Sequence, residues 1–280
     1  MGKIAMDSQN KISPSRISTW LRCETWHFNK YIQRLEPEIK DSSLPFLTGN
    51  LIHDCIADWI QLGKKDAPLP SVTGYLESFI NKNPGKFSFV EKLPILESLK
   101  RIQNLAEVIK SEICSRFTKI LLSEEHLQLQ LPSGVIFHGY PDIVGVCKEG
   151  EITLVDIKIG GKLKSQGDVN GMFNQLAGYA WLLDINGIPA SRVEVLTGSI
   201  SSAAKPRGNG YDVTWVPFDT AAFAQDFQHN LRIFSDFIFF KSPSRRTGLF
   251  NGSCGFCAYR GHCLGRENKG KVKVDKEAVA

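Results

Sequence analysis

Long apolar runs are missing from this sequence of 280 residues. No uninterrupted run approaches the roughly 18 residues that a membrane-spanning helix needs, so the sequence lacks the pattern of a membrane protein. Its polar first residues also lack the apolar centre of a secretory signal. We therefore expect an intracellular, cytoplasmic protein, located in the host cytoplasm if a virus encodes it.

Low-complexity segments and internal repeats are absent as well, while hydrophobic residues make up 42% of the chain. A chain of this length and composition can bury a full core. We therefore expect a single globular domain over 1–280.

Net charge is small, +5 from 34 basic and 29 acidic residues, but it is unevenly distributed. The segment 241–280 holds nine of the basic residues and three of the acidic ones. A basic segment can contact a polyanion by neutralising phosphates, although many basic tails are only solvated. Charge alone leaves contact with nucleic acid open.

Hydrophobic periodicity predicts the helices of the first half of the chain. A Ser-Pro pair at 13–14 is typical of a helix start, and the helix that follows contains Cys23. A second helix over about 48–61 carries His53 on its first turns. Within 64–120 the pattern predicts a short helix and a longer one, which we interpret as a helical insertion.

Strands and helices of the second half follow in an order typical of an α/β sheet domain. Three strands form a meander, and a helix, two further strands and a closing helix come after them. The predicted strands are 126–131, 135–147, 151–159, 192–197 and 211–216, and the predicted helices are 170–184 and 220–241.

Two carboxylates and one amine stand at the ends of neighbouring apolar strands in this meander. Asp156 and Lys158 are two residues apart, so their side chains point to the same face of a strand. If Asp142 approaches from the adjacent strand, the two carboxylates repel each other unless a cation neutralises them. Hard ions such as Mg²⁺ or Mn²⁺ prefer carboxylate oxygen, and the imidazole of His53 would favour Mn²⁺.

A metal site of this kind suits attack of water on a phosphodiester, with Lys158 orienting the water or balancing charge. Taken singly, each residue also has an ordinary interpretation. His53 could be a hydrogen-bonded helix residue, Asp142 a turn residue, and the pair of Asp156 and Lys158 a solvent-facing ion pair.

Seven cysteines, an odd number, favour thiols or metal ligands over a disulfide framework. Cys254, Cys257 and Cys263 form a CxxCx5C run among glycines, and Cys23 is the candidate for a fourth thiolate. The spacing suits either Zn²⁺ or an iron-sulfur cluster and does not choose between them.

The chain resembles the PD-(D/E)XK nuclease superfamily, and within it the RecB-like branch, over about residues 12–265. The motifs occur in the order of that branch. The matching segments are Ser13 to Ile17 at the opening, Gly49 to His53, Gly139 to Asp142, Asp156 to Lys158, and Gln175 to Tyr179 in a QxxxY helix.

The resemblance implies an α/β restriction-endonuclease-like core and a role for each matching residue. His53, Asp142 and Asp156 would ligate Mg²⁺ or Mn²⁺ together with the carbonyl of Ile157, and Lys158 would be the catalytic amine. Gln175 and Tyr179 would lie beside the site and help to position DNA. The expected subdivisions are 12–47 with the first cluster cysteine, the insertion 64–120, the catalytic sheet core 121–241, a cluster-binding loop 242–266 and a basic tail 267–280.

Resemblance to the CRISPR-associated exonucleases and the AddB-type repair nucleases implies a [4Fe-4S] cluster on Cys23, Cys254, Cys257 and Cys263, with Zn²⁺ as the alternative. The implied activity is exonuclease action on single-stranded DNA ends in repair, recombination or CRISPR adaptation. A helicase, recombination or adaptation protein would be its partner. The alternative function is a catalytically weak DNA-binding or assembly subunit, and the sequence does not predict the oligomeric state.

Overall fold

The structure is a computed structural model, and it describes residues 10–35, 37, 44–63, 66–82, 89–200, 211–238, 254 and 257–263. The expected basic tail and most of the expected cluster-binding loop lie outside these residues. The chain divides into two compact units, one of 1–40, 127–139 and 221–280 and the other of 41–126 and 140–220. The expected subdivision of a single domain stays a prediction.

The first unit combines short helices with a small sheet. Its strands β1 (Lys11–Ile12), β4 (Ile136–Gly139) and β3 (Leu127–Gln130) lie in that order, with β1 parallel to β4 and β3 antiparallel to it. Trp20 packs against Phe234 at 5.2 Å between ring centroids, with the rings tilted at 45°, and this contact joins the N-terminal helices to the long helix of the unit. The helices are α2 (Pro14–Arg22), α3 (Glu24–His27), the π-helix η1 (Phe28–Ile32), α9 (Thr220–Phe237) and α10 (Arg260–Cys263).

Cys23 lies at a break between two helices. Ser13 caps α2 and Pro14 is its first residue, as the sequence predicts. The N–H of Cys23 donates to the carbonyl of Thr19, but the backbone of Cys23 is extended, with φ −166° and ψ 117°. The prediction that Cys23 lies within a continuous helix is therefore wrong, because the chain turns at this residue before α3 begins.

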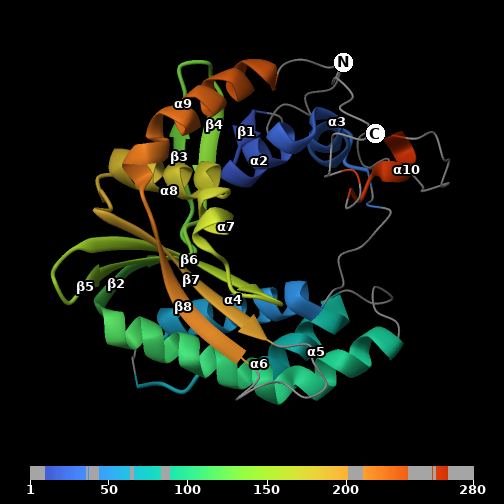
Figure 1. The fold of residues 1–280 in the computed structure, drawn as a ribbon, viewed down its shortest axis with the longest axis vertical. Coiled ribbons are helices and arrows are strands. Elements are labelled where there is room, and N and C mark those ends of the chain that lie inside the picture. The colour runs from blue at the N-terminus through green and yellow to red at the C-terminus, as the bar shows by residue number, and fades with distance from the viewer. Residues whose placement is uncertain are drawn as a thin grey trace, which may run out of the picture. The chain divides into compact units, whose positions relative to one another are not determined.

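The second unit is a five-stranded sheet with helices on it (Figure 1). Strands β2, β5 and β6 form an antiparallel meander, β7 is parallel to β6, and β8 is antiparallel to β7. The strands, in spatial order, are β2 (Phe117–Ser123), β5 (Ile143–Cys147), β6 (Ile152–Gly160), β7 (Arg192–Ile200) and β8 (Tyr211–Phe218).

Three helices supply the main core of this unit against one face of the sheet. Ile52 and Ile102 are fully buried there with Val155 and Ile157, the two apolar residues that alternate with the acidic and basic residues of β6. The alternation predicted for this strand is thus confirmed. The helices of the unit are α4 (Leu44–Gln61), α5 (Val72–Lys82), α6 (Phe89–Arg116), α7 (Gln166–Asn170) and α8 (Phe173–Ile185).

The predicted strand over 135–147 is wrong, because it consists of two strands that belong to different sheets. The break falls at Pro141, which has no N–H to give to a ladder and whose carbonyl accepts the N–H of Glu124 at 3.0 Å. The strand predicted over 126–131 pairs in the small sheet as β3. Its expected place in the meander is taken by β2, whose first residue, Phe117, directly follows α6.

Gly145 of β5 provides a test of how tightly the meander packs. A Cβ at this position would lie 2.7 Å from Cδ1 of Phe117 and 2.9 Å from the carbonyl oxygen of Lys119. We expect Gly145→Ala to lower the free energy of unfolding by about 1–3 kcal/mol, measured by urea denaturation, because the backbone must shift. Gly74→Ala is the control, since a Cβ there meets nothing within 4 Å. Equal stability of both variants would contradict this packing.

Candidate functional site

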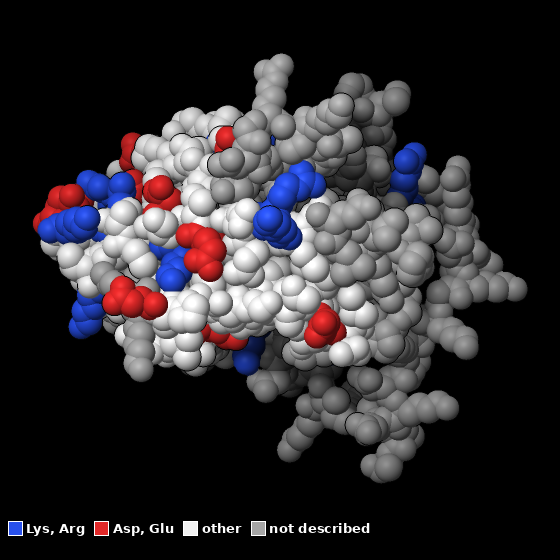
Figure 2. Space-filling view, turned by 90° about the horizontal axis from the view of Figure 1, so that it is seen from below, with Lys and Arg blue, Asp and Glu red and all other residues white. Residues whose placement is uncertain are grey.

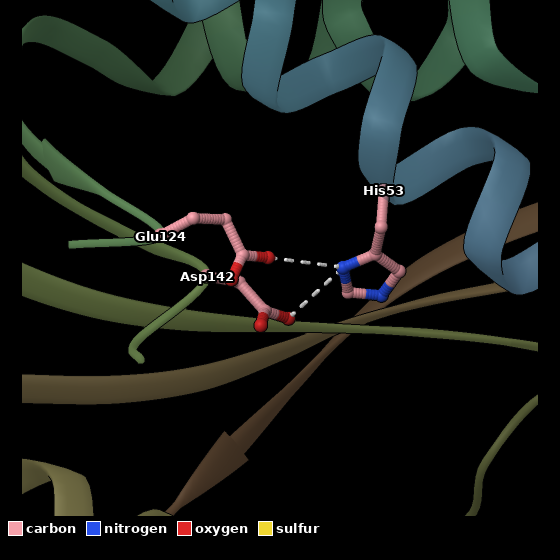
Figure 3. Close-up of side chains that lie close together, drawn as sticks. All are labelled: His53, Glu124 and Asp142. Carbon is pink, nitrogen blue, oxygen red and sulfur yellow. Dashed lines mark ion pairs between the residues drawn. The ribbon is translucent and has the colours of Figure 1, made fainter. Parts of the chain in front are cut away.

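His53 lies on α4 and points toward the meander of the second unit (Figure 3). Its Nδ1 is 3.6 Å from Oε1 of Glu124 and 3.7 Å from Oδ2 of Asp142. Its Nε2 is 2.9 Å from the carbonyl oxygen of Ile157. The helix therefore brings one imidazole to two carboxylates and one backbone carbonyl.

Asp142 directly precedes strand β5 and is held in place by β6. Its side chain is buried, and Oδ2 accepts the backbone N–H of Ile157 at 2.6 Å. This hydrogen bond fixes the position of the carboxylate. Ile157 thus contacts Asp142 through its N–H and His53 through its carbonyl. Two residues that the sequence places 15 positions apart are adjacent because β5 and β6 pair.

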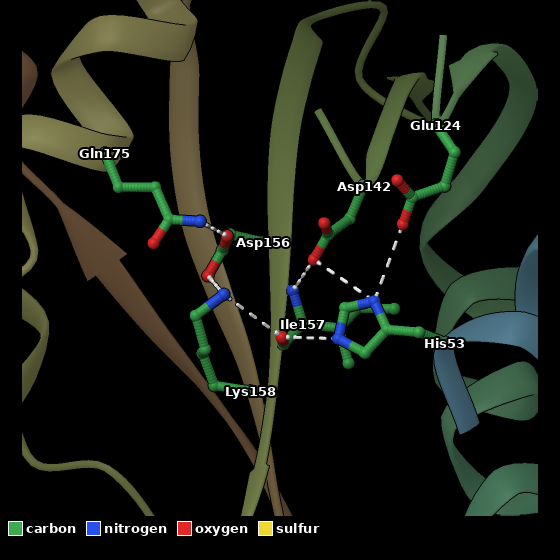
Figure 4. A network of polar contacts seen from close by, with 7 residues as sticks. All are labelled: His53, Glu124, Asp142, Asp156, Ile157, Lys158 and Gln175. Atoms are coloured by element: carbon green, nitrogen blue, oxygen red, sulfur yellow. Dashed lines mark hydrogen bonds and ion pairs between the residues drawn. The ribbon is translucent and has the colours of Figure 1, made fainter. Parts of the chain in front are cut away.

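Asp156 and Lys158 form an ion pair on the other face of β6 from the buried Ile157 (Figure 4). Nζ of Lys158 is 2.6 Å from Oδ2 of Asp156, which has no exposed surface. Nε2 of Gln175, from α8, donates to Oδ1 of Asp156 at 3.0 Å. Both carboxylate oxygens of Asp156 therefore have a partner, and α8 helps to orient the ion pair.

Tyr179 is half-buried on α8, one turn after Gln175. Burial raises the pKa of its hydroxyl, and the negative charges of Asp156 and Asp142 raise it further. Tyr179 is therefore neutral at physiological pH, and its hydroxyl keeps its proton for a hydrogen bond.

Glu124 is a member of this cluster that the sequence motifs do not contain. It follows β2 directly, and its N–H donates to the carbonyl oxygens of Pro141 at 3.0 Å and Asp142 at 3.3 Å. Its backbone has a positive φ of 52°, which is uncommon outside glycine and is often found at functional sites. A prediction of β2 over Phe117–Ser123 would have placed this carboxylate at the end of a strand, although not beside Asp142.

Charges in the cluster shift the pKa values of its members. Burial alone would lower the pKa of His53, but the carboxylates of Asp142 and Glu124 outweigh it and raise the pKa to about 9. Burial raises the pKa of Asp156 to about 6, against the opposing effect of Lys158. Burial would lower the pKa of Lys158, yet Asp156 and Asp142 raise it, so Lys158 remains an ammonium group at neutral pH.

These residues offer ligands that suit a hard divalent ion. One ligand atom each from His53, Glu124 and Asp142 lies within 4.8 Å of the others. Asp156 is outside this group of three but is joined to it through Ile157, whose carbonyl and N–H contact His53 and Asp142. Carboxylate and carbonyl oxygens with one imidazole fit Mg²⁺ or Mn²⁺, which would also relieve the repulsion among the carboxylates.

The four cysteines named above belong to the first unit. Cys23 and Cys257 are buried, and none of the seven cysteines forms a disulfide. The N–H of Cys257 donates to the carbonyl of Cys254 at 3.4 Å. Cys263 is the last residue of α10, which begins at Arg260. Local backbone bonds thus order the segment that carries Cys257 and Cys263, but among the described residues the cysteine sulfurs do not form one close group of possible metal ligands. Soft thiolates, once brought together, fit zinc or an iron-sulfur cluster.

Basic and acidic side chains are intermixed on the face that Figure 2 shows. No helix among the described residues has both the length and the apolar character to span a bilayer.

Similar proteins were found among solved structures but not among curated proteins. Among solved structures, the "Putative exonuclease" of Eubacterium rectale has 15% identity and a TM-score of 0.53, covering 88% of this chain and 90% of its own. The protein SSO0001 has 13% identity and a TM-score of 0.42, covering 94% of this chain and 89% of its own.

The family comparison covers almost the whole chain and includes every residue of the cluster. A model of the PD-(D/E)XK nuclease superfamily matches residues 11–264. The mixed α/β fold and the group of imidazole and carboxylates are those that a metal-dependent nuclease needs. The chain therefore belongs to the PD-(D/E)XK nuclease superfamily.

Proposed function

We propose that this protein is a metal-dependent deoxyribonuclease that hydrolyses phosphodiester bonds, acting as an exonuclease on single-stranded DNA ends. One observation carries the proposal. Four residues from distant parts of the chain contact each other or the backbone of Ile157 (Figure 4). They are His53 of α4, Asp142 just before β5, and Asp156 and Lys158 of β6.

His53, Asp142 and Asp156, with the carbonyl of Ile157, would hold Mg²⁺ or Mn²⁺, and Glu124 adds a carboxylate beside them. Such an ion supplies a Lewis acid that polarises the scissile phosphate and lowers the pKa of the attacking water. Without the ion, the ammonium group of Lys158 and the protonated imidazole of His53 face three carboxylates, so the set contains more negative than positive charge. A dication would therefore be attracted, and more so once His53 has lost its proton.

Lys158 contributes a fixed positive charge at the site. Its ammonium group is held by Asp156 and also donates to the carbonyl of Ile157 at 3.4 Å. Since its pKa is raised, Lys158 would not act as a base but would stabilise the negative charge that develops on the phosphate. Gln175 fixes Asp156 and so keeps the ammonium group in position.

Contacts with the DNA backbone would come from residues around the same edge of the sheet. Gln175 and Tyr179 lie on the helix beside the cluster, and Lys162 and Lys164 lie on the segment between β6 and α7. Lysines bind phosphates without reading the base sequence, which suits an enzyme that degrades any strand. The lysine and arginine of the segment 201–210, Lys205 and Arg207, lie outside the described residues.

The finer assignment follows the motifs in their order along the chain. We assign the protein to the RecB-like branch, with a [4Fe-4S] cluster on Cys23, Cys254, Cys257 and Cys263 that fastens the ends of the chain together. A cytoplasmic role in repair, recombination or CRISPR adaptation, beside a helicase or another partner protein, is part of this proposal. Support comes from the membership of all four cysteines in one compact unit.

Cleavage assays test the proposal directly. Single- and double-stranded DNA, each labelled at one end and then at the other, is incubated with Mg²⁺, with Mn²⁺, or with a chelator. We expect metal-dependent shortening of the single strand from an end. Protein that binds the strand but leaves it uncut under all these conditions would instead favour a DNA-binding assembly subunit.

Metal affinity should depend on pH because of His53. Without the ion, the pKa of about 9 keeps the imidazole protonated at neutral pH, and a ligand must be neutral. The affinity for Mn²⁺ is therefore expected to rise about tenfold per pH unit up to about pH 9 and then to level off.

Isothermal titration in buffers of different ionisation enthalpy measures this affinity and the proton released with it. The control is His53→Gln, which we expect to bind Mn²⁺ more weakly and with little dependence on pH. An unchanged wild-type affinity between about pH 6.5 and 8.5 would show that His53 is not protonated in the free protein or does not ligate the ion.

A further inference from the structure

A cavity of about 810 Å³ opens beside the metal-binding group, within the second unit. His53 and Glu124 line it, and so belong to both the cavity and the cluster. Its other walls come from α4, from α5 and from the segment that joins them. Sites for small organic groups in proteins have volumes of about 300–1,000 Å³, so one nucleoside fits in this space.

Gly74 is part of the cavity wall, and neither its backbone conformation nor its packing requires a glycine. It lies in the first turn of α5, where glycine costs about 0.5–1 kcal/mol relative to alanine. Its φ is not in the left-handed region, and a Cβ there would meet nothing within 4 Å. The missing side chain therefore enlarges the cavity without serving the packing of the helix.

The charge of the wall excludes phosphate. Asp54, Asp58 and Glu124 line the cavity, whereas no lysine or arginine is among the lining residues of the described chain. A phosphodiester chain running through the cavity would be repelled by these carboxylates. A nucleobase carries no charge, and the amino groups of adenine, cytosine and guanine can donate hydrogen bonds to carboxylates.

Two aromatic residues of α5 give the cavity a surface for a base. Tyr75 and Phe79 both line it, and the hydroxyl of Tyr75 donates to Oδ2 of Asp58, which holds the ring in place. Burial raises the pKa of this tyrosine, and the hydrogen bond to Asp58 raises it further, so it adds no negative charge. Stacking on an aromatic ring is the usual way in which proteins hold unpaired bases.

We propose that this cavity binds the terminal nucleoside of a DNA strand whose end is a free hydroxyl, while the adjacent phosphodiester lies at the metal-binding group. The inference rests on the proposed function and adds the reason why cleavage starts at an end. In a closed strand every nucleoside carries a phosphate on both sides, so none can enter the cavity without bringing a second phosphate with it. A strand with a terminal phosphate would likewise place negative charge next to Asp54 and Asp58.

Binding experiments in Ca²⁺ test the cavity independently of cleavage. An internally labelled single strand is titrated with protein by fluorescence anisotropy, as an open strand with hydroxyl ends, as one with phosphates at both ends, and as a closed circle. We expect the wild type to bind hydroxyl ends about tenfold more tightly than the other two forms, from the stacking of one base.

Gly74→Phe fills the cavity and should remove this preference to within about twofold, while the affinity for the circle is retained and shows that the variant is folded. Thr73→Phe is the matched control, since Thr73 is exposed on the same helix and does not line the cavity. It should keep the preference. Gly74→Leu repeats the test with a smaller side chain in case Gly74→Phe does not fold.

The outcomes separate this inference from the proposed function. Equal binding of all three strands by the wild type, or an unchanged preference in Gly74→Phe, would overturn the cavity as the site of the strand end. A wild type that prefers hydroxyl ends but cuts no DNA in Mn²⁺ supports the cavity and refutes the nuclease. A wild type that cuts open strands and circles equally, with no preference in binding, supports the nuclease and refutes the cavity.

Discussion

Asp142→Asn is expected to reduce cleavage of single-stranded DNA in Mn²⁺ by at least about a thousandfold while the protein stays folded. The amide has the shape of the carboxylate, and its oxygen can still accept the N–H of Ile157. It has no negative charge, however, so it holds a divalent ion far more weakly. Initial rates and metal affinity, measured on the same preparation, should fall together.

Lys158→Met should cause a loss of similar size for a different reason. Methionine keeps most of the length of the lysine stem but removes the ammonium group that faces Asp156 at 2.6 Å. Asp156 has no exposed surface, so without this partner it should take up a proton and lose its charge near neutral pH. Both the stabilising cation and one metal-binding carboxylate would then be lost.

Matched controls separate charge at the site from charge elsewhere in the second unit. Glu151→Gln removes an acidic group whose partner is Arg192, and Lys119→Met removes an exposed lysine of β2. Both should keep rates within about twofold of the wild type and the same melting temperature. A site variant with more than about a tenth of wild-type activity would contradict the assigned roles.

Cys254→Ala is expected to give colourless protein with a large loss of stability. A cluster that joins Cys23 to Cys254 closes a loop of 231 residues, which contributes at most about 5 kcal/mol by restricting the unfolded chain. The brown colour and the iron content of anaerobically purified protein should both be lost, and the melting temperature should fall. Cys114→Ala, on α6 in the other unit, should change none of these properties.

Metal analysis decides between the two candidate groups at the cysteines. Iron and sulfide in equal amounts support the cluster, and one zinc per chain supports the alternative. A Cys254→Ala protein that keeps both colour and wild-type melting would show that Cys254 is not a ligand.

The residues of β6 could be placed from the sequence because their alternation is so regular. Apolar Val155 and Ile157 pack against the helices, and Asp156 and Lys158 face the other side, as the period of two predicts. The position of His53 could also be predicted, since α4 has a clear apolar face and a glycine, Gly63, with φ 66° two residues after its end.

Strand pairing could not be predicted in the same way, because the local sequence pattern does not say which strands become neighbours. The segment from 135 to 147 is mostly apolar, and only the pairing on either side of Pro141 shows that it passes from one sheet to another. Glu124 was missed for the same reason. Glu124 reaches the site because its N–H is hydrogen-bonded to the carbonyls of Pro141 and Asp142. In addition, β2 begins at Phe117 directly after the last residue of α6, so the sequence pattern does not mark where the helix ends and the strand begins.

Anomalous diffraction from crystals soaked in Mn²⁺ tests the central claim most directly. The account predicts an anomalous peak within bonding distance of His53, Asp142 and the carbonyl of Ile157, with Asp156 beside it, and the loss of this peak in crystals of Asp142→Asn. Crystals of the wild type that bind Mn²⁺ only elsewhere, or keep the same peak in Asp142→Asn, would contradict it.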